Sequence, residues 1–72
     1  MNLTARLKGD IIQIFDTTTG GIVRNHTLPP GQYSNLTVAG EAVSITILRP
    51  YANDIIRTIS MKTGAIISEY NL

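Results

Sequence analysis

The chain has 72 residues, a formal net charge of +1 and no cysteine. This length allows one domain with a modest core, and the missing thiols exclude disulfides and thiolate metal sites, so support from other chains is expected. The six Lys and Arg residues are dispersed, which disfavours a nucleic-acid module, and no stretch reaches the roughly 18 apolar residues of a membrane span.

The first half of the chain is predicted to form three strands and a connector. Apolar and polar side chains alternate over residues 3–8 with the period of a half-buried strand, and Gly9-Asp10 then marks a tight turn. Residues 11–16 form a second strand that is apolar on both faces, and residues 21–28 form a third. Pro29-Pro30-Gly31 is expected to be a stiff connector, because proline cannot donate to a strand ladder.

The second half is predicted to form four strands. A linking strand covers residues 32–39, and the next strand, residues 42–48, alternates between Val or Ile and Ser or Thr. After a longer loop at residues 49–54, two more strands follow at residues 55–61 and 65–70. The nine threonines and eleven isoleucines of the chain favour strands over helices, so an all-β fold of about seven antiparallel strands is expected.

Two stretches carry the signature of a tight hairpin turn. The first runs from Thr17 to Gly20 and follows an aspartate, and the second runs from Met61 to Gly64. Asp-x-x-Thr-Gly suits a type I turn that ends in the left-handed region, where glycine has no Cβ to clash. Both glycines are thus explained by backbone geometry without a ligand.

An internal repeat organises the chain. Residues 10–28 recur imperfectly as residues 54–72, at an offset of 44 (54 − 10). A fixed offset marks one supersecondary unit used twice. We therefore expect one all-β domain, residues 1–72, with repeated meanders at 3–28 and 43–72 that form a small sandwich, a barrel or paired blade-like units. The matched positions are Asp10/Asp54, Ile11/Ile55, Ile12/Ile56, Thr19/Thr63, Gly20/Gly64, Ile22/Ile66 and Leu28/Leu72.

The residues that could carry chemistry are few. His26, the single histidine, has no nucleophile or orienting acid in a recognisable motif with it, and we interpret it as a surface or edge-strand residue. Asp10, Asp16 and Asp54 stand at turns, where aspartate caps backbone N–H groups. The sequence therefore predicts no catalytic residue, no cofactor and no metal site.

The hairpins resemble known β-structures. Residues 12–23, with their Asp-x-x-Thr-Gly turn, are similar to the strand–turn–strand hairpins of β-propeller blades, and residues 56–68 are similar too, although Ser60 replaces the aspartate. A propeller needs about four blades or more, so one chain cannot close alone but three chains with two blades each could. The whole chain also resembles the small, duplicated β-hairpin proteins of tailed-phage virions, which accompany capsids as accessory or decoration subunits.

Three functions of different classes follow. The resemblance implies a non-enzymatic structural virion protein of the capsid-decoration or head-fibre type, with itself or capsid proteins as partners. It would be made in the host cytoplasm, since the N-terminus lacks the apolar core of a signal peptide. The alternative is an oligomeric, propeller-lectin-like carbohydrate-binding module that uses Tyr33, Tyr51 and Tyr70. A nucleic-acid-binding barrel is disfavoured by the charge pattern.

Overall fold

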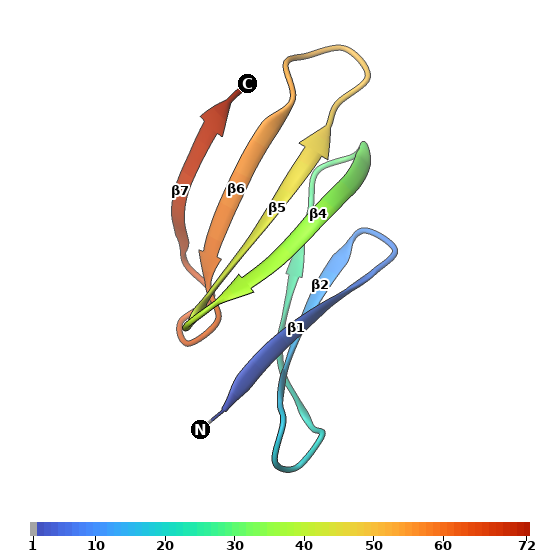
Figure 1. Ribbon diagram of the computed structural model, residues 1–72. Coiled ribbons are helices and arrows are strands. Elements are labelled where there is room, and N and C mark those ends of the chain that lie inside the picture. The colour runs from blue at the N-terminus through green and yellow to red at the C-terminus, as the bar shows by residue number, and fades with distance from the viewer. Residues whose placement is uncertain (1) are drawn as a thin grey trace.

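The computed structural model describes residues 2–72, and it is all-β as the sequence predicts (Figure 1). No helix capable of crossing a membrane occurs among residues 2–72. The predicted fold class is confirmed, and the strand ends agree with the expected ones to within two residues. The seven strands are β1 (Leu3–Lys8), β2 (Ile11–Asp16), β3 (Ile22–Thr27), β4 (Gln32–Ala39), β5 (Ala42–Leu48), β6 (Ile55–Ser60) and β7 (Ile66–Asn71).

The strands form two antiparallel sheets. One has the order β1-β2-β3 and the other has the order β4-β5-β6-β7. The strand expected to link two meanders, β4, pairs with β5 and so becomes an edge strand of the second sheet. Figure 1 shows the smaller sheet lying behind the larger one, with β1 next to β4, which it contacts. The remaining edges, β3 and β7, lie on the opposite side of the molecule.

One hydrophobic core lies between the two sheets. In β5 the alternation works as expected, because Val43, Ile45 and Ile47 are buried while Ser44 and Thr46 face outward. On the outward side, the Ser44 and Thr58 hydroxyls hydrogen-bond across β5 and β6 at 2.7 Å. Both sheets therefore share a single core rather than building two separate ones. Its buried members are Ile12, Ile14, Leu28, Val43, Ile45, Ile47, Ile55, Ile59 and Met61.

The two hairpins β2–β3 and β6–β7 have the same backbone geometry. The amide of Gly20 donates to the Asp16 carbonyl and the amide of Gly64 donates to the Ser60 carbonyl, each at 2.8 Å. Both glycines have positive φ, +76° and +81°, as the turn signature predicts. The closing bonds at the far ends also match, from Leu28 N to Asp10 O and from Leu72 N to Asp54 O, both at 2.8 Å.

Each hairpin carries a β-bulge that the alternation of the sequence does not reveal. In the first hairpin the register shifts between Ile14 and Phe15, so that Ile14 opposes Arg24 but Phe15 opposes Ile22. The second hairpin shifts at the matching position, between Thr58 and Ile59. The extra residue places Ile22 on the opposite face from Arg24, although an uninterrupted strand would place residues 22 and 24 on the same face.

Candidate functional site

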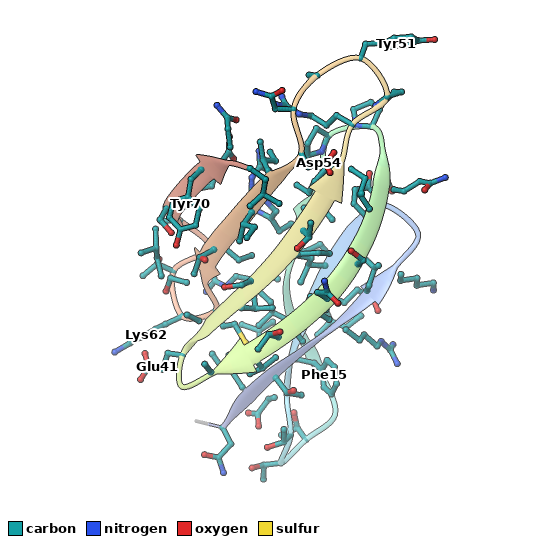
Figure 2. All side chains as sticks on the ribbon, turned by 45° about the horizontal axis from the view of Figure 1, so that its top comes forward. Phe15, Glu41, Tyr51, Asp54, Lys62 and Tyr70 are labelled. Atoms are coloured by element: carbon teal, nitrogen blue, oxygen red, sulfur yellow. The ribbon has the colours of Figure 1, made fainter. Side chains whose placement is uncertain are left out.

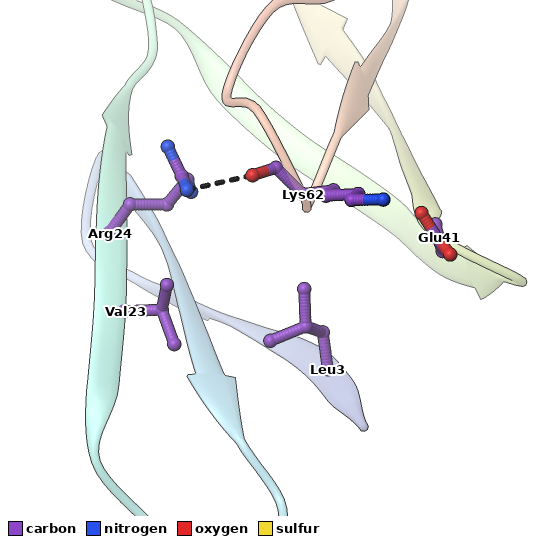
Figure 3. Close-up of a pocket in the computed structure, with 5 residues that line it drawn as sticks. All are labelled: Leu3, Val23, Arg24, Glu41 and Lys62. Carbon is purple, nitrogen blue, oxygen red and sulfur yellow. Dashed lines mark hydrogen bonds between the residues drawn. The ribbon is translucent and has the colours of Figure 1, made fainter. Parts of the chain in front are cut away.

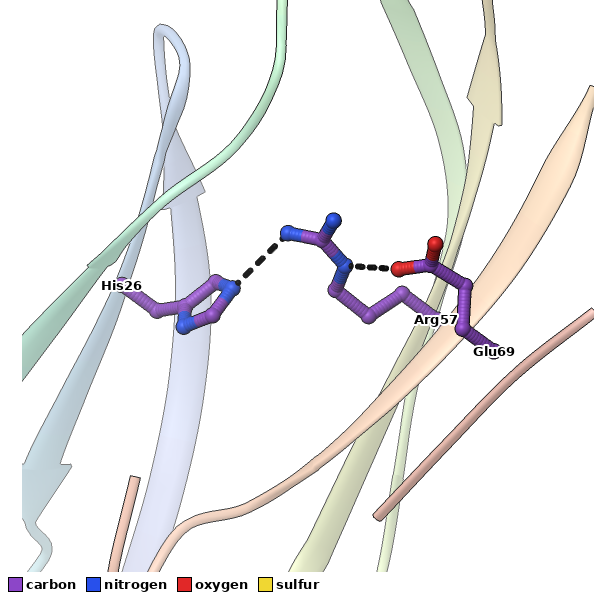
Figure 4. Close-up of polar contacts among 3 residues, drawn as sticks. All are labelled: His26, Arg57 and Glu69. Atoms are coloured by element: carbon purple, nitrogen blue, oxygen red, sulfur yellow. Dashed lines mark hydrogen bonds and ion pairs between the residues drawn. The ribbon is translucent and has the colours of Figure 1, made fainter. Parts of the chain in front are cut away.

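A cluster of three polar side chains joins the two sheets at the side where β3 and β7 form the edges (Figure 4). Its members are His26, Arg57 and Glu69. The Arg57 guanidinium, on β6, donates through Nε to Glu69 Oε2 on β7 at 2.6 Å and through Nη1 to His26 Nε2 on β3 at 3.2 Å. Arg57 is opposite Glu69 in the hairpin register, so the ion pair is a direct cross-strand contact. Because arginine only donates, His26 accepts with a neutral imidazole.

His26 lies on an edge strand, one of the two places expected for it, but its side chain is not at the surface. It is half-buried and opposes the buried Ile12, so the ring faces the other sheet. This orientation follows from the register of β2 with β3. The side chain of His26 therefore belongs to the contact between the sheets.

We predict that His26 makes the protein less stable as the pH falls below about 6.5. Burial of the imidazole, and next the positive charge of Arg57, lower the pKa of His26 from its usual 6.5. The unfolded chain then takes up a proton before the folded chain does, so the free energy of unfolding falls between the unfolded pKa and the lower folded one. Above that window the contribution is fully present.

The measurement is chemical denaturation of the parent and of His26→Gln at about pH 7.5 and about pH 5.5. All other ionisable residues are the same in both proteins, so the difference in stability between the two isolates the histidine. The stability of the parent relative to His26→Gln is expected to shrink at the lower pH. A difference that stays constant, or that grows, would contradict this environment for His26.

Arg24 makes a second contact between the sheets. Its guanidinium donates to the Lys62 carbonyl at 2.8 Å and to the Thr63 carbonyl at 3.0 Å, which ties β3 to the β6–β7 turn. The Nε atom of Arg24 is buried without a hydrogen-bond partner. A hollow of about 240 Å³ lies beside this contact, where Leu3 and Val23 form the apolar wall (Figure 3). This volume is below the roughly 300 Å³ at which small-molecule pockets usually begin.

The acidic residues are dispersed, as the sequence indicates. The Asp16 carboxylate accepts the Thr18 amide at 2.8 Å and so caps its turn as expected. At Asp10 and Asp54, the backbone carbonyls rather than the carboxylates accept the hairpin-closing bonds. Within residues 2–72, no three His, Asp or Glu side chains gather closely enough to hold a metal ion.

The three tyrosines occupy separate places. Tyr33 is half-buried and donates its hydroxyl to the Pro29 carbonyl, so it supports the connector between the sheets. Tyr51 is 99% exposed at the tip of the β5–β6 loop, whereas Tyr70 stands on β7 (Figure 2). The three tyrosines that keep a carbohydrate-binding module open as an alternative therefore do not form one shared site.

Strand β7 presents a row of exposed apolar side chains. Ile67, Tyr70 and Leu72 are 59%, 58% and 67% exposed, and Ile66 is also exposed at the start of the strand. Tyr70 lies opposite Ile56, which is half-buried on the same outward face of the sheet. Single exposed apolar residues are common, but a contiguous apolar patch on a small protein marks an interaction surface.

Sequence reasoning missed Arg24, Arg57 and Glu69 as a group. A signal for the ion pair was present, since Arg57 and Glu69 stand opposite each other once the hairpin register is counted outward from the Lys62-Thr63-Gly64 turn. The contacts of Arg24 and His26 with the other sheet had no such signal, because they depend on how two sheets stack.

Comparison with protein-family models, with curated proteins and with solved structures finds no match to this chain.

Proposed function

We propose that this chain is a non-enzymatic structural subunit that acts by assembling with copies of itself and with other protein surfaces, as capsid-decoration or head-fibre subunits of a virion do. The observation that carries the proposal is the apolar row on β7, formed by Ile67, Tyr70 and Leu72. Such a row is costly in water and is covered when another chain docks on it.

The small core supports the same proposal. For a chain of this length, burial at about 25 cal/mol per Å² is nearly cancelled by about 1.5 kcal/mol of conformational entropy per ordered residue. Strands β3 and β7 also present edges whose backbone groups have no strand partner on the outer side within residues 2–72. Contact with neighbouring chains contributes the missing burial and covers the edges.

The polar side chains that connect the two sheets are consistent with a structural role. The Nε2 atom of His26 accepts a hydrogen bond from Arg57 and, within residues 2–72, makes no hydrogen bond with a hydroxyl or a thiol that the imidazole could activate. Arg57 is only 14% exposed in its side chain and Arg24 is bound to turn carbonyls, so both cations are used in holding the sheets together.

We predict that the thermal stability depends on protein concentration. When the folded chain is stabilised by binding other copies, dilution withdraws that contribution by mass action, and the melting midpoint falls. Thermal melts followed by circular dichroism over a roughly hundredfold dilution are expected to show a lower midpoint at each step. A midpoint that does not move would contradict stabilisation by self-association.

A carbohydrate-binding module remains the alternative proposal, and a glycan array separates it from an assembly subunit. Tyr51 supports it, because an aromatic ring fully exposed at a loop tip is available for stacking on a sugar. Binding of a defined glycan that Tyr51→Ala abolishes would favour this function. No binding by an assembled sample would leave the structural role as the proposal.

A further inference from the structure

The two hairpins can be compared residue by residue, because they share sequence, turn, bulge and closing bonds at the offset of 44 (54 − 10). We define the front face of a hairpin as the side that carries Ile12 and Ile14 in β2–β3, and therefore Ile56 and Thr58 in β6–β7. The back face carries Ile11, Gln13 and Phe15 in the first hairpin, and Ile55, Arg57 and Ile59 in the second.

The two hairpins bury opposite faces. In β2 the buried apolar residues are Ile12 and Ile14, on the front face, whereas the buried residue of the back face is the polar Gln13. In β6–β7 the buried residues are Ile55 and Ile59, on the back face. The hairpins are therefore not related by a twofold axis across the core, which would bury the same face of both. Instead, the front of the first hairpin packs on the back of the second.

This packing leaves the front face of the second hairpin and the back face of the first hairpin outside the core. The front face of β6–β7 points outward, and its residues are exposed counterparts of core residues. Leu28 is 3% exposed, whereas its counterpart Leu72 is 67% exposed. Tyr70 corresponds to His26, which contacts the other sheet in the first hairpin. The outer front face thus retains the apolar character of a face that is buried elsewhere in the same chain.

The back face of β2–β3 also points outward, and the Arg6 side chain of the neighbouring strand β1 lies over part of it. Arg6 donates through Nε to Gln13 Oε1 at 2.9 Å, and its guanidinium carbon lies 5.5 Å from the centre of the Phe15 ring. Ile11 and Phe15 are half-buried, and Ile22, opposite Phe15, is exposed. This face thus offers apolar surface with a cation, and the outer front face offers hydroxyls and the Tyr70 ring, which arginine can contact.

We propose that another copy of the chain binds each of these two outer faces. In this arrangement the front face of β6–β7 in one copy packs on the back face of β2–β3 in the next copy. The proposal rests on the assembly function and specifies its geometry. This contact between two chains has the same geometry as the packing of the two hairpins within each chain. Two different surfaces meet, so the interface is heterologous, and successive copies form a closed ring or an open fibre.

The test uses one variant for each face and a matched control. Tyr70→Glu places a charge on the outer front face, and Ile22→Glu places one on the outer back face; both side chains are more than half exposed, so the fold does not depend on them. Tyr51→Glu adds the same charge at a loop tip that belongs to neither face. Circular dichroism confirms that each variant remains a folded β-protein.

Native mass spectrometry of the single variants and of their mixture gives the result. Tyr70→Glu alone and Ile22→Glu alone are expected to be monomers of 7.8 kDa, while Tyr51→Glu assembles like the parent. Mixed in equal amounts, the two face variants are expected to form a two-chain species and nothing larger. Each pair then uses the intact front face of one chain and the intact back face of the other.

Other outcomes would overturn the proposal in distinguishable ways. A parent that assembles, with one face variant that still assembles normally or a mixture that gives no two-chain species, would reject the head-to-tail geometry while self-assembly stands. A parent that is monomeric at every concentration would reject self-assembly itself, and the geometry with it.

Discussion

Ile45→Ala is expected to destabilise the chain by about 2–5 kcal/mol, the usual cost of removing a large side chain from a packed core. Ile45 is 1% exposed and lies at the centre of β5, between β4 and β6 in the larger sheet. Stability in domains is of the order of 0.05–0.15 kcal/mol per residue, so a loss of this size approaches the total for so short a chain. We expect the variant to be largely unfolded or to unfold at much lower denaturant.

The control is Thr46→Ala, the next residue of the same strand, whose side chain faces outward and is half-buried. Urea denaturation of both variants and the parent at one fixed protein concentration gives the comparison. Thr46→Ala is expected to lose less than about 1 kcal/mol. Equal losses for the two variants would show that Ile45 does not belong to the core.

Gly31→Ala is the second substitution with a large expected effect. Gly31 ends the connector between the sheets with φ of +155°, in a region that residues with a Cβ avoid. A residue forced into such a region costs about 1–3 kcal/mol. The added Cβ would also lie 2.6 Å from the Leu48 carbonyl oxygen, which is fixed in the ladder between β4 and β5, so the loss is expected to exceed that range.

Gly20→Ala is the matched control, since it also has positive φ but no atom lies within 4 Å of the added Cβ. Only the backbone penalty of about 1–2 kcal/mol applies there. Denaturant melts are expected to place Gly31→Ala well below Gly20→Ala. The opposite order would mean that the connector does not pass against β5 as described.

Local features of the sequence were sufficient to predict the strands and turns. The strands β1 and β5 and the glycine turns at Gly20 and Gly64 depend on neighbouring residues only, and the structure confirms these strands and turns. Burial alternates along β5 as expected, but not along β1, where Leu7 is exposed. The equivalence of the hairpins was also visible, as a repeat in sequence. The strands and turns of the fold could therefore be read from sequence almost entirely.

The arrangement of the sheets could not be predicted in the same way. Strands β2 and β6 are apolar on both sides, so the sequence does not say which face each one buries, and the structure buries opposite faces. The bulges, the tight passage at Gly31 and the contact of His26 with Arg57 depend on residues distant in sequence. The candidate site lies in these contacts, which explains why it was missed.

Sedimentation velocity of the purified chain over a wide range of concentrations determines whether the chain assembles with copies of itself. We expect a particle whose mass is a multiple of 7.8 kDa and that dissociates into smaller species on dilution. A single species of 7.8 kDa at every concentration, with an unchanged melting midpoint, would contradict self-assembly.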